Sequence, residues 1–110
     1  MNSNLNQVCI VYVTTASLGN ARDLARSMVE ENHVACANIF PIQSIYRWQG
    51  RIEESQEFQI FFKTSTSKFA DLQRRIIELH PYENPEIIQI PIVDGNEAYL
   101  SWIHECVKIG

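Results

Sequence analysis

The chain has 110 residues and a mass of 12.7 kDa, the usual size of a single domain. It is 45% hydrophobic and 20% charged, which is typical of a folded protein and not of a disordered one. The net charge of −4 argues against a nucleic-acid partner, because phosphates attract a basic surface.

Other features of the composition bear on membranes and redox chemistry. The apolar runs reach about six residues, which is too short to cross a membrane. Residues 1–7 are polar and lack the pattern of a signal peptide. The three cysteines are widely spaced and form no C-x-x-C pair, so they indicate neither a zinc ribbon nor a disulfide framework. We therefore expect a cytoplasmic protein, with one domain over residues 1–110 and an ordered core of about 7–108.

The first predicted elements are a buried strand and an amphipathic helix. Residues 8–13 are apolar or aromatic and mostly β-branched, which is typical of a strand covered on both faces. Asn20 and Asp23 then resemble a capping box, so we expect the helix to begin there and to end near Asn32. Apolar side chains recur at helical spacing in this segment, at Ala21, Leu24, Ala25, Met28 and Val29.

Two long strands, residues 35–46 and 51–64, are predicted to form a hairpin with Gln49 and Gly50 at its tip. Pro41 marks a bulge, a bend or an edge position, because proline cannot donate a hydrogen bond to a neighbouring strand. Twelve extended residues span roughly 40 Å, whereas a twelve-residue helix spans roughly 18 Å. The hairpin should therefore extend past the helices, and its exposed apolar side chains predict an obligate small oligomer.

The remaining elements complete a ferredoxin-like order. A second helix should run from about residue 67 to 79 and stop there, because Pro81 keeps the preceding residue out of the helical conformation. Residues 87–92 form a strand whose proline places it at an edge, and residues 96–108 form an extra C-terminal helix. The β-α-β-β-α-β order predicts an α+β fold with both main helices on one face of a four-stranded antiparallel sheet.

Residues 80–86 form the segment richest in reactive side chains. Two prolines stiffen a short loop that presents an imidazole, a phenol and two carboxylates. These groups suit an anion, metal or metabolite site. An equally weighted alternative is that His80 caps helix carbonyls and Tyr82 packs at an interface.

Glu57, Lys63 and Cys36 are further candidates. Glu57 and Lys63 share one strand face but lie roughly 20 Å apart, so they cannot pair with each other. Lys63 could meet residues 80–86, although a solvated surface charge is the more common role for either side chain. Cys36 lies between two alanines, a setting more typical of a small core residue than of a metal ligand. No local pair of histidine and cysteine is spaced to chelate a metal.

The sequence motifs of several enzyme classes are missing. There is no nucleophile elbow, no P-loop and no glycine-rich dinucleotide fingerprint. The loop after the first strand lacks the basic group of an acylphosphatase-like anion site. The third strand lacks the basic and glycine positions of an RNA-recognition domain. We therefore expect no catalytic activity.

Residues 80–88, with the sequence HPYENPEII, resemble the signature of the CutA family of divalent-cation tolerance proteins. Further segments resemble the family in the same order, namely residues 29–39, 46–50, 57–64 and 99–103. The resemblance covers nearly the whole chain from Val8 onward. It implies a homotrimer of ferredoxin-like subunits with a PII-like architecture, and a role in tolerance to copper and other divalent cations.

The resemblance also implies where ligands would bind. A cleft between subunits would gather Trp48, Glu57, Lys63, His80, Tyr82 and Glu86. If copper or another divalent cation binds, we expect a weak site that uses His80 with Glu83 or Glu86, or Cys36 if it is accessible, and we expect no obligatory cofactor. Some relatives have cysteine in place of Thr14 and histidine in place of Leu79, so this chain lacks two ligands that copper favours. The alternative is a PII-like small-molecule-binding or signalling module that holds an anionic metabolite in the cleft.

Overall fold

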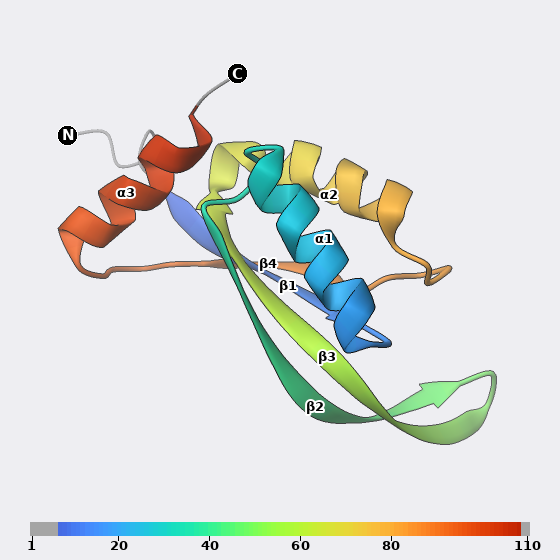
Figure 1. Ribbon diagram of the computed structural model, residues 1–110. Coiled ribbons are helices and arrows are strands. Elements are labelled where there is room, and N and C mark those ends of the chain that lie inside the picture. The colour runs from blue at the N-terminus through green and yellow to red at the C-terminus, as the bar shows by residue number, and fades with distance from the viewer. Residues whose placement is uncertain (1–6, 109–110) are drawn as a thin grey trace.

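Strands and helices alternate along the chain in the predicted order. The computed structural model describes residues 7–108, and all elements are shown in Figure 1. The elements are β1 (Val8–Thr15), α1 (Leu18–Glu30), β2 (Cys36–Trp48), β3 (Arg51–Ser65), the 3₁₀ turn η2 (Thr66–Lys68), α2 (Phe69–Leu79), β4 (Ile87–Pro91) and α3 (Glu97–Val107). None of the helices within residues 7–108 combines the length and the hydropathy needed to cross a membrane.

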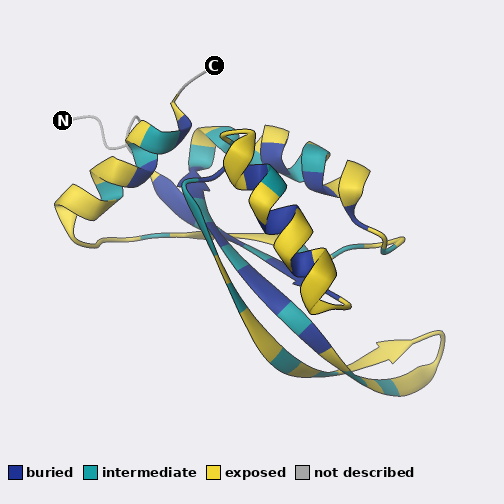
Figure 2. Ribbon diagram, viewed as in Figure 1, coloured by how far each residue is buried: buried dark blue, intermediate teal, exposed yellow. Residues whose placement is uncertain are grey.

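The sheet has the strand order β2-β3-β1-β4, and every neighbouring pair is antiparallel. Helices α1 and α2 lie together on one face of it (Figure 1). This is the ferredoxin-like arrangement, so the predicted fold class is confirmed. The core lies between this face and the two helices, where Val11 and Phe62 of the sheet are fully buried with Met28 and Leu72 of the helices. Figure 2 shows the same division, with buried residues along the inner helix faces and the centre of the sheet.

The start of α1 differs from the prediction. Ser17 is the N-cap, with extended backbone, and its Oγ accepts a hydrogen bond of 3.0 Å from the Asn20 backbone N–H. The prediction that Asn20 caps the helix is therefore wrong, because the hydroxyl of Ser17 satisfies a free N–H one turn earlier. At the other end, Asn32 has a φ of 63°, which ends the helical backbone two residues after Glu30.

The hairpin of β2 and β3 closes through a two-residue turn. Gln49 and Gly50 both have positive φ, as a type I′ turn requires. The pairing register runs without interruption from Cys36 opposite Lys63 to the tip, so Pro41 sits in a regular edge strand and not at a bulge. The hairpin extends well past the helices (Figure 1), and the molecule measures 50 × 25 × 21 Å.

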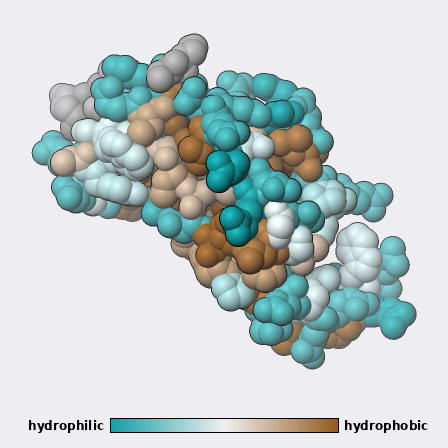
Figure 3. Space-filling model, in the orientation of Figure 1, coloured by the Kyte–Doolittle hydropathy of each residue, from teal (hydrophilic) through white to brown (hydrophobic). Residues whose placement is uncertain are grey.

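The sheet face opposite α1 and α2 is called the open face here. Because side chains alternate between the two faces along each strand, the open face carries Tyr12, Phe40, Phe61, Ile88 and Ile90. Phe61 packs against both Tyr12 and Phe40, with ring centroids 5.2 and 5.1 Å away. Helix α3 contacts the end of this face nearest Lys63, whose Nζ lies 5.8 Å from the Tyr99 ring centroid. In the view of Figure 3, apolar surface is also exposed where the hairpin leaves the helix layer.

Candidate ligand-binding site

His80 fastens the loop of residues 80–86 to the sheet. Its backbone N–H donates to the Ile76 carbonyl at 2.8 Å, and its ring is buried. Ring atom Nδ1 accepts a hydrogen bond of 3.0 Å from the Tyr82 backbone N–H. Because Nδ1 accepts, Nε2 carries the proton and donates to the Thr14 carbonyl at 2.7 Å. The ring therefore joins the loop to β1 and does not cap helix carbonyls.

Tyr82 pairs with a nearly buried carboxylate from the hairpin. Its hydroxyl donates to Glu57 Oε2 at 2.6 Å, and Glu57 is only 8% exposed. Burial, and then the hydrogen bond to Glu57, raise the pKa of Tyr82 well above its usual value of 10. The phenol therefore remains a hydrogen-bond donor over the physiological range, and it holds the carboxylate in one orientation.

A second carboxylate is held in a similar way. Thr14 Oγ1, from β1, donates to Glu86 Oε1 at 3.3 Å across 72 residues of sequence. Glu86 directly precedes β4, the neighbour of β1 in the sheet, so strand pairing places the two side chains together. On the open face, hydroxyl groups therefore orient two carboxylates: Tyr82 orients Glu57, and Thr14 orients Glu86.

These groups border a cavity of about 670 Å³, called the open-face cavity here. It lies between the distal half of the hairpin and residues 80–86. Its apolar wall is formed by Tyr12, Ile42, Ile45, Tyr46 and Trp48. Its acidic groups are Glu57, Glu83 and Glu86, and no Lys, Arg or His stands among the described residues that line it. The volume lies within the roughly 300–1,000 Å³ range of small-molecule sites.

Gln59 also lines the open-face cavity and was not predicted as a site residue. It is 2% exposed, and its side-chain nitrogen Nε2 has no hydrogen-bond partner among the described residues. A buried amide donor without a partner is unusual, because leaving it unpaired costs about 1–3 kcal/mol. Its place two residues from Glu57 on one strand face was the available signal, but alternation alone did not reveal its burial.

The structure brings together four of the six predicted ligand-binding residues. The open-face cavity is lined by Trp48, Glu57, Tyr82 and Glu86. His80 does not line it, but its ring is hydrogen-bonded to Thr14 and Tyr82, which do. Lys63 lies elsewhere, where its Nζ donates to Asn38 Oδ1 at 2.7 Å beside Tyr99. The suggested meeting of Lys63 with residues 80–86 is not found within the chain. The opposite end of the same strand face, at Glu57, reaches that loop instead.

The predicted metal ligands do not converge within one chain. Cys36 is only partly buried, at the α3 end of the open face, with its Sγ 4.0 Å from the Tyr99 hydroxyl. The interpretation of Cys36 as a core residue is therefore wrong, because it lies on an edge strand and faces away from α1 and α2. Both ring nitrogens of His80 are already hydrogen-bonded, and Glu83 is exposed on the loop.

No group of three or more His, Cys, Asp or Glu side chains within residues 7–108 is arranged to hold a metal ion. Metal sites in proteins need several ligands around one point, with their other atoms supported by hydrogen bonds. The predicted set of Cys36, His80 and Glu83 therefore does not fit a metal centre in a single chain.

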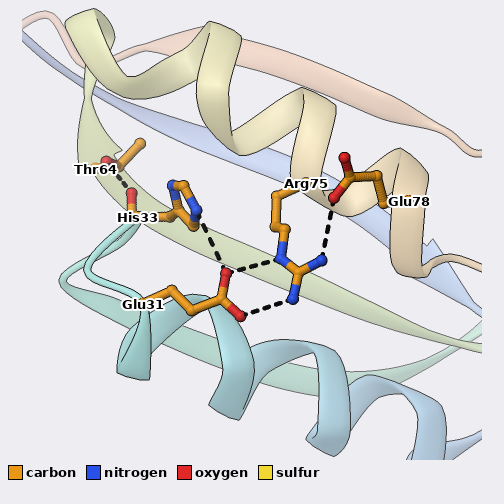
Figure 4. Close-up of polar contacts among 5 residues, drawn as sticks. All are labelled: Glu31, His33, Thr64, Arg75 and Glu78. Atoms are coloured by element: carbon orange, nitrogen blue, oxygen red, sulfur yellow. Dashed lines mark hydrogen bonds and ion pairs between the residues drawn. The ribbon is translucent and has the colours of Figure 1, made fainter.

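A separate polar network lies on the helical side of the sheet (Figure 4). Glu31 accepts two hydrogen bonds from Arg75, from Nε at 2.8 Å and Nη2 at 3.0 Å. Arg75 Nη1 also donates to Glu78 at 3.0 Å, and His33 Nε2 lies 3.5 Å from Glu31. Arg75, above all through its hydrogen bonds, lowers the pKa of Glu31 below its usual 4.5. The network joins the end of α1 to α2, so its role is structural.

Comparison with known proteins gives consistent matches over almost the whole chain. A family model described as CutA1 divalent ion tolerance protein matches residues 9–106. A divalent-cation tolerance protein CutA from Thermus thermophilus is 46% identical over 97 residues, which cover 87% of this chain and 94% of the relative. Another, from Archaeoglobus fulgidus, is 40% identical over 98 residues, which cover 89% of this chain and 96% of the relative.

Solved structures agree with these matches. The crystal structure of CutA1 from Oryza sativa superposes with a TM-score of 0.91 at 33% identity, covering 94% of this chain and 96% of that one. The structure of a periplasmic divalent cation tolerance protein CutA from Archaeoglobus fulgidus gives a TM-score of 0.90 at 39% identity. The match covers 92% of this chain and 99% of that one. The similarity therefore includes the sheet, the helices and the long hairpin.

Proposed function

The chain belongs to the CutA1 divalent ion tolerance family, and from this membership we propose that it protects its cell against copper and other divalent cations. The observation that carries the proposal is the family match across residues 9–106. Relatives named for divalent-cation tolerance at 40–46% identity support it. We assign no enzymatic activity to the chain, in keeping with the missing catalytic motifs.

Our proposal does not depend on a tight metal centre. Cys36, His80 and Glu83 do not form a group that could hold a metal ion within residues 7–108, and both His80 ring nitrogens are engaged. Binding of copper by this set would require the ring to give up a hydrogen bond, which costs stability. Weak binding of copper or another divalent cation stays a prediction.

We also propose that the chain acts as a homotrimer with a PII-like architecture. The open face and the hairpin supply the surface for it, because Phe40, Ile88 and Ile90 are exposed on the sheet and Ile45 and Ile52 on the hairpin. Apolar patches of this kind mark protein interfaces. A cytoplasmic location stays a prediction, since one relative is named chloroplastic and one solved neighbour periplasmic.

Growth under copper stress tests the main proposal. In a bacterial strain that lacks its own CutA, expression of this chain should restore growth at copper(II) concentrations that inhibit the strain with an empty vector. The two strains should grow equally without added copper, which controls for the burden of expression. Equal growth across the whole copper series would contradict the proposed role.

A second candidate function is that of a small-molecule-binding module. The specific observation behind it is the open-face cavity, whose lining includes Gln59, a residue whose Nε2 has no hydrogen-bond partner within residues 7–108. The expected anionic metabolite finds little support in the subunit, because Lys63 lies outside the lining and the His80 ring is occupied.

A further inference from the structure

We propose that Arg51, at the tip of the hairpin, enters the open-face cavity of a neighbouring copy and pairs there with carboxylates of the lining. This pairing rests on the homotrimer proposed above, and it identifies a contact by which one copy recognises the next. It also gives the cavity a protein occupant in place of a small molecule. The charge of the lining, the position of Arg51 and the direction of the hairpin support it.

The lining of the open-face cavity carries negative charge that the subunit does not balance. Its carboxylates belong to Glu57, Glu83 and Glu86, and no basic side chain is among the described residues that line it. Hydrogen bonds from Tyr82 and Thr14 orient two of these groups but leave their charge in place. A trimer that covers the open face would remove the carboxylates further from water, and buried charges without partners are strongly destabilising. Assembly through this face therefore requires a basic group from another copy.

Arg51 is a basic side chain that lacks an acidic partner in its own subunit. It is the first residue of β3, it is exposed, and it forms no ion pair within residues 7–108. Glu57 lies six residues further along the same strand, roughly 20 Å away, so Arg51 cannot reach it. The unbalanced acid and the unbalanced base thus stand at separate places of one chain, and a contact between copies can join them.

Strand alternation places Arg51 on the open-face side of the hairpin. The register of β2 and β3 runs without interruption to the pair of Trp48 and Arg51, so every second residue of β3 from Glu57 to Arg51 lies on one side. Because the proposed trimer forms through the open face, this side of the tip meets a neighbouring copy. Arg47 directly precedes Trp48 on β2 and therefore lies on the opposite side of the hairpin.

The direction of the hairpin also favours a contact with another copy. Strand β1 pairs with β3 only from Phe58 onward, so residues 51–57 extend beyond the sheet that the two strands share. The tip projects past the helices as well (Figure 1). In such a contact each copy gives a tip and receives one at a different surface, which is a heterologous interface, and interfaces of this kind can close into a ring of three.

Reversal of charge on either side of the contact tests the pairing. Light scattering of the full chain over a dilution series, in urea if needed, gives the concentration at which half of the trimer dissociates. Arg51→Glu should raise this concentration about tenfold or more, because an attraction between charges becomes a repulsion. Arg47→Glu makes the same change of charge on the opposite side of the hairpin and should leave the concentration unchanged.

A compensating change in the cavity separates loss of the pairing from loss of folding. Glu83 is exposed, so Glu83→Arg should fold and should weaken the trimer as Arg51→Glu does. The double variant Arg51→Glu/Glu83→Arg should return close to the native value, because the charges are exchanged and the attraction is restored. Glu54→Arg, outside the cavity, is the matched control and should not restore assembly in the Arg51→Glu chain.

The possible results distinguish this pairing from the homotrimer on which it rests. A monomeric native chain would contradict the homotrimer itself. A trimeric native chain in which Arg51→Glu and Arg47→Glu dissociate alike would overturn the pairing and leave the homotrimer intact, as would a double variant that does not recover. Calorimetric titration of the native trimer with argininamide tests a small cation as the alternative occupant. We expect no binding, and one argininamide per subunit without a change of mass would assign the cavity to a small molecule.

Discussion

At the scale of single residues, the hydrogen bonds made by side chains of residues 80–86 depend on partners far away in sequence. His80 acquires its role from the Thr14 carbonyl, and Tyr82 acquires its role from Glu57. The two side chains also pack together, with ring centroids 4.8 Å apart. Residue types alone identified the loop as a candidate site. They left open whether it binds a ligand directly or supports the residues that do, and the contacts assign His80 to the supporting role.

The hydrogen bond between Tyr82 and Glu57 should have a measurable effect on stability. Tyr82→Phe leaves a nearly buried carboxylate without its donor, so we expect the free energy of unfolding in urea to fall by about 2 kcal/mol. Tyr46→Phe is the matched control, because its hydroxyl lies 3.4 Å from Ser55 Oγ at the exposed surface. It should change stability by less than about 0.5 kcal/mol. Equal effects of the two variants would contradict the assignment.

The pKa of Tyr82 predicts how this effect varies with pH. Because the pKa is raised in the folded state, the contribution of the phenol is fully present below the usual value of 10 and is lost as pH rises through the folded value. The difference between the native chain and Tyr82→Phe should therefore be constant from neutral pH upward and decrease only in strongly alkaline solution. A difference that disappears near neutral pH would be inconsistent with a protonated phenol as the donor.

At the scale of elements, local signals predicted nearly every strand and helix. The 3.6-residue period of α1 and α2, the alternation in β3 and the stop before Pro81 all act over a few residues. The error in the start of α1 is also local, because Ser17 lies only three positions before Asn20 and its side chain can cap a helix equally well. The association of α1 with α2 through Glu31 and Arg75, by contrast, joins residues 44 positions apart.

Replacement of Glu31 should weaken the contact between α1 and α2 in a pH-dependent manner. Its pKa is lowered in the folded state, chiefly by Arg75, so its contribution is present above 4.5 and is lost as pH falls through the lowered value. Glu31→Gln should therefore have a lower melting temperature than the native chain at neutral pH. The difference between the two melting temperatures should disappear in acid.

The neighbouring Glu30→Gln serves as the control for Glu31→Gln. Glu30 pairs only with exposed Arg26, at 3.7 Å, among the ion pairs of the described residues. Exposed pairs of this kind contribute little, so its melting temperature should match that of the native chain. A gap for Glu31→Gln that is the same at neutral and acidic pH would contradict the ionic origin of the effect.

At the scale of the whole molecule, the long hairpin and the open face leave apolar surface that one subunit does not cover. The helices occupy one face of the sheet, and α3 reaches only one end of the other (Figures 1 and 2). Both edge strands carry a proline, which limits but does not abolish strand pairing with another chain. An assembly of copies would cover this surface.

Light scattering can test the homotrimer with two isoleucine variants. The native chain should have a mass three times 12.7 kDa at micromolar concentration. Ile88→Glu places a charge on the open face, where the side chain is 47% exposed, and should reduce the mass. Ile77→Glu makes the same change on α2, at 55% exposure, and should leave the mass intact. A monomeric native chain would contradict the proposed assembly.

The sequence by itself determined the order of elements, the ferredoxin-like topology and the long hairpin, and it identified residues 80–86 as a candidate site. These follow from periodicity, proline positions and strand lengths, which operate between near neighbours. Tertiary structure alone decided that Gln59 is buried with its Nε2 unpaired among the described residues, that Glu57 meets Tyr82 and Thr14 meets Glu86, and that Cys36 lies outside the core. The physical reason is that strand order, register and the placement of helices on one face decide which distant side chains meet, and residue type alone does not specify those contacts.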